Sequence, residues 1–366
     1  MKSDVLEKNS NAVFKDKLAQ YKSLIDSDIE EYCSTIDART LKTYGAYSQI
    51  VSKAYTDILS RGGKRIRGVL TCVGYEMCGG TDNKMIIQAA RAIEMMHAYM
   101  LIVDDIQDRA ELRRRGSSAH KMLEASHRQY KWKGDPAHTG VSLALNSALL
   151  GSHGASLVLS SLEVDPELRL KALNIMNHTM IVTAHGQTND IANEIIQEVP
   201  LSSIETVMQW KTAHYSFLNP IHMGMVLAGA SCEDTNAITQ YALNLGKAFQ
   251  ITDDLMVVSD QKNTGKNPID DIREGKQTLL TAHALKNSPD AIFLKKCLGN
   301  QQLNLEDFER CKEVLSESGA VSYARKAADD YVKTARESLE EHAERWDRPS
   351  VVFLDGLAQY ILERTK

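Results

Sequence analysis

The sequence predicts an all-α fold, organised as a single large helical bundle. Proline interrupts helix interiors, and none occurs before Pro136, so the first 135 residues can form long helices. Apolar residues recur at steps of three to four positions, as between Ile87 and Leu101, which is the spacing of a helix face. Alternating strand patterns bounded by hairpin turns are hard to find. We therefore expect one all-α domain over residues 1–366, with residues 1–12 open to fraying.

Turn signals divide the chain into successive segments, and a helix is expected in each of them. The segments are roughly 15–30 residues long, a length typical of helical bundles. No internal repeat, low-complexity tract or linker interrupts them. In chain order, the stops are Gly62-Gly63, Gly79-Gly80, Gly134-Asp135-Pro136, Asp165-Pro166, Glu198-Val199-Pro200 and residues 265–268.

Composition and charge exclude several classes of protein. The 43 Lys and Arg against 48 Asp and Glu give a net charge of −5, which argues against a general nucleic-acid binder. No apolar run approaches the ~18–20 residues that span a bilayer, so no integral membrane association is expected. The acidic N-terminal segment lacks the apolar region of a signal peptide. The six cysteines are scattered without a C-x-x-C pair, as in a reduced cytoplasmic protein.

The segment LIVDDIQD, residues 101–108, places three carboxylates at the end of an apolar stretch. Asp104 and Asp108 stand four residues apart, so they share one helix face. Their charges repel unless a cation neutralises them, and oxygen ligands suit Mg²⁺, which keeps waters and accepts substrate phosphates. A solvated acidic face is the alternative. The apolar residues 97–103 favour carboxylates that end a buried helix.

A second acidic cluster follows in FQITDDLMVVSD, residues 249–260, where Asp253 and Asp254 again end an apolar approach. Downstream, the segment TGKNPIDDIREGK supplies Lys266 and Lys276, within reach of any phosphate held by this aspartate pair. Two acidic helix ends can face each other across a bundle cavity, as metal carboxylates do in other bundles. A phosphate-bearing substrate bridged by Mg²⁺ would fit between them.

Two basic segments accompany the acidic ones. RGGKRIRG, residues 61–68, follows a Gly-Gly turn at an expected helix start, where backbone N–H groups also favour anions. ELRRRG, residues 111–116, comes shortly after the first acidic cluster. Arginine side chains match phosphate oxygens with two parallel hydrogen bonds. A charged surface is the alternative, but beside aspartate clusters in an acidic chain these segments indicate a diphosphate site.

Taken in order, the motifs resemble those of the trans-isoprenyl diphosphate synthases, in particular short-chain enzymes of the archaeal geranylgeranyl type. The resemblance implies an isoprenoid synthase-like bundle around a deep central cavity. It also implies a homodimer. The motifs are GGKRIR (62–67), DDIQD (104–108), RRRG (113–116), GQTND (186–190), KT (211–212), FQITDD (249–254) and GK…DIREGK (265–276).

The resemblance implies two substrates, isopentenyl diphosphate and an allylic diphosphate. Lys64, Arg67 and His97 match the isopentenyl diphosphate site. The arginine run has one residue more than the family pattern. Alignment on RRG assigns Arg115 to isopentenyl diphosphate and Arg114 to the allylic diphosphate, whereas counting from Asp104 selects Arg113 and Arg114; the first assignment is preferred.

The aspartates match the family's metal-binding motifs, which implies Mg²⁺ as cofactor, with three ions bound together with substrate. Asp104 and Asp108 match the ligands that hold the allylic diphosphate from one side, and Asp253 matches the ligand on the other. Asp105 and Asp254 match supporting carboxylates of the same metal-binding motifs.

The central motifs match groups near the allylic substrate. Asp190 would orient Lys211, with Gln187 beside it in the GQTND motif. Lys211, Thr212 and Gln250 match groups near a developing allylic cation and its diphosphate. Lys266 and Lys276 match basic contacts to that diphosphate.

The implied reaction is ionisation, condensation and elimination. Metal and basic groups stabilise charge on the departing diphosphate, and the isopentenyl double bond attacks the allylic cation. A proton then leaves, and the released diphosphate is the expected acceptor. The Thr212 hydroxyl and the Gln250 amide oxygen can stabilise the cation without capturing it, while water is excluded.

The second acidic motif departs from the family pattern, because Val257 stands where a third aspartate is usual. Archaeal-type synthases also lack this third aspartate, so activity is expected. A lower metal affinity at this motif is compatible with that expectation. A Gly-Asp pair common after the arginine motif is also replaced, near Asn146-Ser147.

Product length is expected to depend on the helix that ends at Asp104. Met100 lies one turn deeper and Met96 about 12 Å deeper at 1.5 Å per residue, while Tyr99 is the nearest bulky side chain and a candidate pocket floor. Core packing is the alternative role for these residues. The expected product is geranylgeranyl diphosphate (C20), with farnesyl diphosphate (C15) as alternative.

Two other functions also use such a bundle. A class I terpene cyclase carries a DDxxD helix but lacks an isopentenyl site, so Lys64, Arg67 and His97 argue against it. A non-catalytic subunit of a heteromeric synthase is favoured only by Val257, against an otherwise intact set of motifs.

Overall fold

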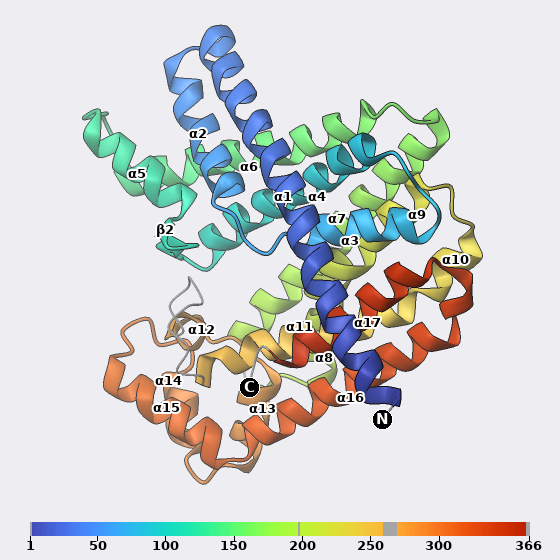
Figure 1. Cartoon of the computed structure of the whole chain (residues 1–366). Coiled ribbons are helices and arrows are strands. Elements are labelled where there is room, and N and C mark those ends of the chain that lie inside the picture. The colour runs from blue at the N-terminus through green and yellow to red at the C-terminus, as the bar shows by residue number, and fades with distance from the viewer. Residues whose placement is uncertain (1, 197, 259–268, 364–366) are drawn as a thin grey trace. The chain divides into compact units, whose positions relative to one another are not determined.

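A computed structural model describes residues 2–196, 198–258 and 269–363, with side chains from Ser10 onward (Figure 1). The described chain is almost entirely helical, which confirms the predicted all-α class. In chain order the elements are α1 (Lys2–Tyr44), α2 (Ala46–Ser60), α3 (Ile66–Met77), α4 (Asn83–Gln107), β1 (Leu112–Arg113), β2 (Gly116–Ser117), α5 (Ala119–Gln129), α6 (Pro136–Ser160), α7 (Pro166–Ile195), α8 (Leu201–Val207), η1 (Met208–Leu218), α9 (Asn219–Leu227), α10 (Cys232–Ala237), α11 (Thr239–Asp254), η2 (Leu255–Val258), α12 (Ile269–Glu274), α13 (Leu279–Asn287), α14 (Ala291–Cys297), α15 (Leu305–Glu317), α16 (Ala320–Glu341), η3 (Ala343–Arg345) and α17 (Arg348–Glu363).

Helix boundaries follow the predicted stops. Asp82 caps α4 by accepting a hydrogen bond from the Met85 N–H at 3.0 Å. Asp135 caps α6 in the same way, and Pro136 occupies the first turn, where its missing N–H costs nothing. Gly45, with φ of 86°, separates α1 from α2. The stop predicted at residues 265–268 lies outside the described residues.

Three features differ from the sequence expectation. α1 is 43 residues long, well beyond the predicted segment length, because no proline or glycine interrupts it before Gly45. Several helices after α11 are short, for example α12 with six residues. A two-stranded antiparallel hairpin, β1 with β2, was not predicted.

The chain forms two compact units. Unit 1 comprises residues 1–17, 73–80 and 174–366, and unit 2 comprises residues 18–72 and 81–173. In unit 2, α4 packs against α6 and also contacts α2 and α5 (Figure 1). Most of α4 is buried, so its last turn is held by a rigid, packed helix. The expectation of a single domain over residues 1–366 stays a prediction.

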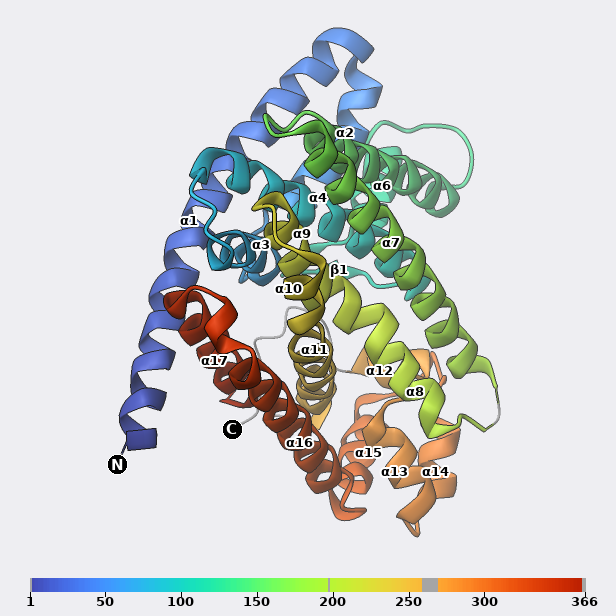
Figure 2. The same cartoon turned by 90° about the vertical axis from the view of Figure 1, so that its right-hand side faces the viewer.

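In unit 1, α11 packs between η1 and α16 and also contacts α17 (Figure 2). Its apolar core continues through α13, α14 and α15, where Leu280, Leu294, Cys311 and Val314 are buried. η1 is a π-helix of 11 residues. A π-helical run of this length is rare and is usually associated with function.

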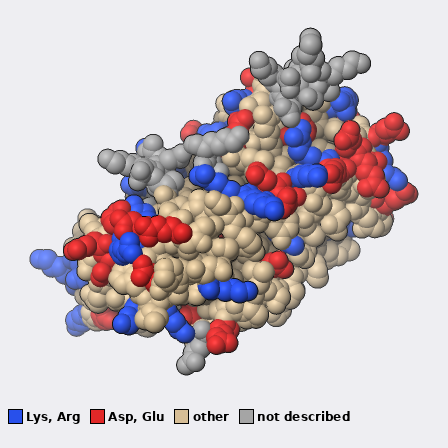
Figure 3. Space-filling view, turned by 90° about the horizontal axis from the view of Figure 1, so that it is seen from below, with Lys and Arg blue, Asp and Glu red and all other residues tan. Residues whose placement is uncertain are grey.

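Acidic and basic side chains intermingle on the molecular surface. On the face seen in Figure 3, among the residues drawn in colour, Lys and Arg side chains lie beside Asp and Glu without forming one extended basic area.

Among the described residues, two helices, α4 and α6, are long and apolar enough to cross a membrane by length and composition alone, which qualifies the sequence expectation. The evidence is weak, because 61% of the apolar window of α4 is buried inside the protein and core helices pass the same test. Only 28% of the corresponding α6 window is buried, so α6 presents an apolar surface.

Candidate active site

The last turn of α4 carries the first acidic cluster, as predicted. Asp104 is partly exposed, Asp105 is fully buried, and Asp108 is the buried C-cap residue whose N–H donates to the Asp104 carbonyl at 2.8 Å. The Arg113 guanidinium bonds Asp105 through Nε at 2.8 Å and Asp104 through Nη2 at 3.3 Å. Burial alone would lower the pKa of Arg113, but the neighbouring carboxylates of Asp105 and Asp104 raise it. Arg113 is therefore an ion-pair partner of the aspartates.

Arg114 and Arg115 form the two-residue turn between β1 and β2. Their φ angles are 51° and 64°, a pair of left-handed conformations that glycine or asparagine usually supplies in hairpins. Arg61 holds the hairpin, because its Nη1 donates to the carbonyls of Arg113 at 2.9 Å and Ser117 at 2.7 Å. Left-handed backbone at two arginines costs conformational free energy, and backbone strain of this kind is typical of functional sites.

A basic cluster lies beside this hairpin in unit 2. A Cβ added to Gly63 would lie 3.3 Å from Nη2 of Arg114, so the Gly62-Gly63 loop packs against that guanidinium. Nη1 of Arg67 lies 3.3 Å from Nε2 of His97. Burial, together with Arg67 and Arg114, lowers the pKa of His97 well below its usual range, so the imidazole is neutral and accepts this bond.

The same environment acts on Arg114. Burial lowers its pKa to about 10, and the like charges of Arg65, Arg67 and Arg113 contribute while Glu94 opposes. The guanidinium remains charged at neutral pH. Cations gathered this closely repel one another, so a multivalent anion would stabilise the cluster.

Arg65, which the sequence places in the basic segment 61–68 without assigning it a substrate contact, is a structural residue. It is 4% exposed, and it donates to Asp26 at 2.8 Å, to the Leu59 carbonyl at 2.8 Å and to Glu94 at 3.3 Å. Glu94 also accepts the N–H of Gly68 at 2.9 Å. This network fixes the loop that carries Lys64 and the first turn of α3 that carries Arg67.

Replacing Arg65 with alanine is expected to lower the free energy of unfolding by about 3–5 kcal/mol, because the Glu94 carboxylate would stay buried without its charge partner. The exposed pair of Arg128 and Glu124 serves as control, and Arg128→Ala should cost less than about 1 kcal/mol. Urea denaturation followed by circular dichroism measures both. Equal, small losses would show that the Arg65 network does not stabilise the loop.

In unit 1, four charged side chains form one connected network. Lys211 Nζ lies 2.7 Å from Asp190, and Lys276 Nζ lies 3.1 Å from the same carboxylate and 2.6 Å from Glu194. Burial would raise the pKa of Asp190, but the two ammonium groups outweigh it and lower the pKa. Asp190 thus pairs with both lysines, and its orienting role toward Lys211 in the reaction stays a prediction. Gln187 is buried one turn earlier on α7.

Thr212 and Gln250 are joined directly. The Thr212 hydroxyl in η1 donates to Oε1 of Gln250 in α11 at 2.6 Å, and Nε2 of Gln250 donates to Asp254 at 2.8 Å. The π-helical geometry of η1 places Lys211 and Thr212 on adjacent sides, toward α7 and α11 respectively.

Asp253 and Asp254 end α11, as predicted. Burial raises the pKa of Asp254 well above its usual range, and Asp271, Asp253 and Asp190 reinforce the shift. The chain then turns into η2, where Val257 is 8% exposed and belongs to the apolar core of unit 1. The third position of the second motif therefore cannot supply a ligand. Lys266 lies outside the described residues.

The acidic helix ends fit a divalent cation. Carboxylates at the C-terminus of a helix oppose the negative end of its dipole, and both α4 and α11 end this way. Their oxygen-only donors suit Mg²⁺. Within the described residues, no group of three or more His, Cys, Asp or Glu side chains is arranged to hold a metal by itself.

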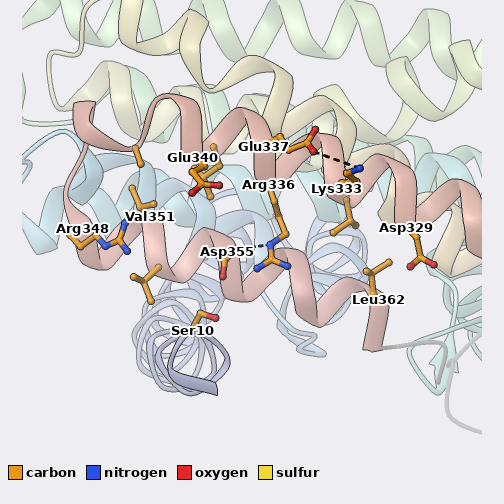
Figure 4. Close-up of a pocket in the computed structure, with 14 residues that line it drawn as sticks. Ser10, Asp329, Lys333, Arg336, Glu337, Glu340, Arg348, Val351, Asp355 and Leu362 are labelled. Atoms are coloured by element: carbon orange, nitrogen blue, oxygen red, sulfur yellow. Dashed lines mark hydrogen bonds and ion pairs between the residues drawn. The ribbon is translucent and has the colours of Figure 1, made fainter. Parts of the chain in front are cut away.

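A separate groove of about 540 Å³ lies between α16 and α17 in unit 1, beside Ser10 of α1 (Figure 4). Four of its charged side chains form ion pairs: Arg336 bonds Asp355 at 2.7 Å, and Lys333 lies 3.9 Å from Glu337. None of the sequence-predicted site residues lines it, so this groove is not the candidate site.

The predicted residues thus form two groups, each within one unit. Unit 2 holds Lys64, Arg67, Met96, His97, Tyr99, Met100, Asp104, Asp105, Asp108, Arg114 and Arg115, and unit 1 holds Gln187, Asp190, Lys211, Thr212, Gln250, Asp253, Asp254 and Lys276. Sequence reasoning missed Arg61, Glu94, Glu194 and Asp271, and it named Arg65 only as part of the basic segment 61–68. Glu194 could have been found, because it follows Asp190 by four residues on the same helix face.

A family model described as polyprenyl synthetase matches residues 48–315. The geranylgeranyl diphosphate synthase of Saccharolobus solfataricus is 29% identical over 326 residues, 86% of this chain and 91% of that protein. The geranylfarnesyl diphosphate synthase of Aeropyrum pernix is 30% identical over 320 residues, 86% of this chain and 95% of that protein.

A solved structure has the same fold. The geranylgeranyl pyrophosphate synthase from Corynebacterium glutamicum, complexed with isoprenyl diphosphate and magnesium, superposes with a TM-score of 0.88 at 28% identity, over 95% of this chain and 99% of that one. The family match covers well over half of the chain, and the archaeal relatives confirm the resemblance found in the motifs. This chain belongs to the polyprenyl synthetase family and is a prenyltransferase.

Proposed function

We propose that the enzyme condenses isopentenyl diphosphate with allylic diphosphates in a Mg²⁺-dependent reaction and releases mainly geranylgeranyl diphosphate. The observation that carries the proposal is the cluster of Arg67, His97 and Arg114 in unit 2, close in sequence and structure to the carboxylates that end α4. The condensation requires cationic side chains that bind a diphosphate and carboxylates that bind Mg²⁺. The geranylgeranyl synthases among the relatives support the product.

In unit 2, we assign Lys64, Arg67, His97 and Arg115 to isopentenyl diphosphate and Arg114 to the allylic diphosphate. The neutral imidazole of His97 can donate one hydrogen bond to a phosphate oxygen while it accepts from Arg67. Asp104 and Asp108, with Asp105 in support, would hold Mg²⁺ against the allylic diphosphate. Bound Mg²⁺ would supply charge stabilisation to the departing diphosphate.

In unit 1, Asp253 with Asp254 is assigned to the metal, and three ions in total are proposed. Lys211 and Lys276, fixed by Asp190, donate hydrogen bonds to the allylic diphosphate, and Lys266 is assigned the same role from sequence alone. The Thr212 hydroxyl and Gln250 amide are held by each other at 2.6 Å, so their oxygen dipoles are oriented before the allylic cation develops.

A purified-protein assay tests this function. Isopentenyl diphosphate and geranyl or farnesyl diphosphate are incubated with the enzyme and Mg²⁺, and products are sized by chromatography after dephosphorylation. We expect C20 product that requires isopentenyl diphosphate and disappears with EDTA. Cyclised product without isopentenyl diphosphate would instead indicate a terpene cyclase, and binding without turnover would indicate a non-catalytic subunit.

Product length is proposed to depend on the face of α4 that bears Met96, Tyr99 and Met100. Met96 is buried, while Tyr99 and Met100 are partly exposed. Tyr99→Ala is expected to shift the main product to C25 or longer, because removing the ring deepens the pocket by about one aromatic side chain. Product sizing with farnesyl diphosphate as primer measures the shift.

Ile87→Ala is the matched control for Tyr99→Ala. Ile87 is a buried residue of the same helix, and its position nine residues before Met96 places it on the side of α4 away from Met96, at about 3.6 residues per turn. This variant should lose about 2–5 kcal/mol of stability and keep the wild-type product. An unchanged product from Tyr99→Ala would exclude Tyr99 as the pocket floor.

A cytoplasmic homodimer is the proposed assembly. α6 exposes a row of large apolar side chains, which monomeric proteins seldom leave in contact with water. The row consists of Leu145, Leu149, Leu150 and Leu157. Sedimentation velocity should give the mass of two chains, twice 40.7 kDa, at micromolar concentration.

A further inference from the structure

Two glycines contact the backbone of the π-helix that carries Lys211 and Thr212. A Cβ added to Gly186 of α7 would lie 2.8 Å from the carbonyl carbon of Trp210 and 2.9 Å from Cα of Lys211. A Cβ added to Gly246 of α11 would lie 2.5 Å from Cβ of Ala213. These separations are too short for real atoms, and most of the atoms met are backbone, so an alanine at either glycine requires a helix to move.

Each glycine is followed, four residues later on the same helix, by the partner of a site residue. Asp190 follows Gly186 and pairs with Lys211 at 2.7 Å, and Gln250 follows Gly246 and accepts from Thr212 at 2.6 Å. Residues four apart share one helix face. The close approach permitted by each glycine is therefore made one turn before the polar contact, on the face that meets η1.

Glycine weakens a helix relative to alanine, yet both helices place it inside a helical turn at this contact. The loss of helix stability at each glycine is explained by the close approach of its helix to η1, which a larger residue would prevent. Because α7 and α11 both pack closely against η1, Lys211 can pair with Asp190 of α7 while the next residue, Thr212, bonds Gln250 of α11.

We propose that Gly186 and Gly246 are positioning residues that set the distance of η1 from α7 and α11, and thereby place Lys211 and Thr212 for reaction with the allylic diphosphate. The inference rests on the proposed function of these two side chains. A displacement of about 1 Å in a positioned group can lower a rate by about a hundredfold, which is the size of shift that an added methyl group imposes.

Gly186→Ala and Gly246→Ala are the test variants, and Gly356→Ala is the matched control. A Cβ at Gly356 of α17 would lie 2.7 Å from Cβ of Phe14 and 2.8 Å from the carbonyl carbon of Ser10 on α1, an equally tight helix crossing without a site residue. Steady-state kinetics with each substrate varied, and the thermal midpoint, are measured for all three.

For Gly186→Ala we expect kcat to fall by about tenfold or more and KM for the allylic diphosphate to rise, with KM for isopentenyl diphosphate within about twofold of wild type. Gly246→Ala should lower kcat in the same way. Gly356→Ala should lower the thermal midpoint and leave kcat unchanged. A Gly186→Ala enzyme that loses only thermal stability, as the control does, would overturn the proposal. If Gly186→Ala does not fold, Gly246→Ala decides the question, because two of the three nearest atoms to its added Cβ are side-chain atoms, those of Ala213 and Phe217.

A second readout separates this inference from the proposed function. Thermal midpoints of Gly186→Ala, Asp190→Asn and the double variant form a cycle that needs no activity. If Gly186 acts through the Asp190–Lys211 pair, the double variant should lose less than the sum of the single losses, whereas Gly186→Ala combined with Gly356→Ala should be additive. Additivity in both cycles would refute the positioning role. Absence of condensation activity in the wild type would refute the proposed function instead, with the cycle unaffected.

Discussion

Asp104→Asn is expected to lower kcat by about a thousandfold, since it removes a metal ligand from the helix end that would neutralise the departing diphosphate. The substitution keeps the size of the side chain and removes its charge. The Arg113 guanidinium, which bonds both Asp104 and Asp105, would then interact with Asp105 more strongly. Steady-state kinetics over a Mg²⁺ titration measure the effect, and the Mg²⁺ concentration for half-maximal rate should rise.

Asp82→Asn is the control at the other end of the same helix. Asp82 caps α4 through the Met85 N–H, and asparagine caps helices as well as aspartate does. This variant should match wild type in both kcat and Mg²⁺ dependence. A comparable loss of activity from both variants would mean that the charge of Asp104 has no specific role.

Lys211→Met is expected to lower kcat by about a hundredfold and to raise KM for the allylic diphosphate, because one oriented cation is removed from the place where charge develops. Among the described residues, Asp190 would keep its ion pair with Lys276. Since the two ammonium groups together lower the pKa of Asp190 against the effect of burial, this pKa should rise when one of them is lost. Kinetics with varied allylic substrate measure the first effect.

Lys333→Met serves as the comparison for Lys211→Met. Lys333 lies in the same unit with 74% of its side chain exposed and a weak 3.9 Å pair with Glu337, so its loss should leave kcat within about twofold, since exposed pairs contribute little. Wild-type kinetics in Lys211→Met would remove Lys211 from the reaction and leave its bond to Asp190 as a structural contact only.

Much of the helical framework could be predicted, because its signals are local. Glycine and proline mark the boundaries of α2, α3, α6 and α7, and the acidic motifs end α4 and α11 as their apolar approaches indicate. Stepwise apolar spacing, however, does not distinguish an α-helix from a π-helix, since both bury one face. The close contacts that η1 makes with Gly186 and Gly246 come from helices that lie elsewhere in the sequence.

The sequence predicts which residues belong to the site, but it does not predict which of them bond to one another. Arg65 bonds Asp26 across 39 positions, and Lys276 bonds Glu194 across 82; such pairs exist only once the helices pack. The Arg114-Arg115 turn was missed because arginine seldom adopts φ above zero. The replacement of the third aspartate by Val257 is explained only by the structure, in which the valine side chain packs in the apolar core of unit 1.

Radiolabelled isopentenyl diphosphate, incubated with the purified chain, Mg²⁺ and farnesyl diphosphate, tests whether this enzyme elongates an allylic diphosphate by condensation. We predict label in a C20 alcohol after dephosphorylation, with no label incorporated when EDTA is present or when the allylic primer is omitted. Failure of the label to enter any prenyl product, with geranyl, farnesyl or geranylgeranyl diphosphate as primer, would contradict the proposed reaction.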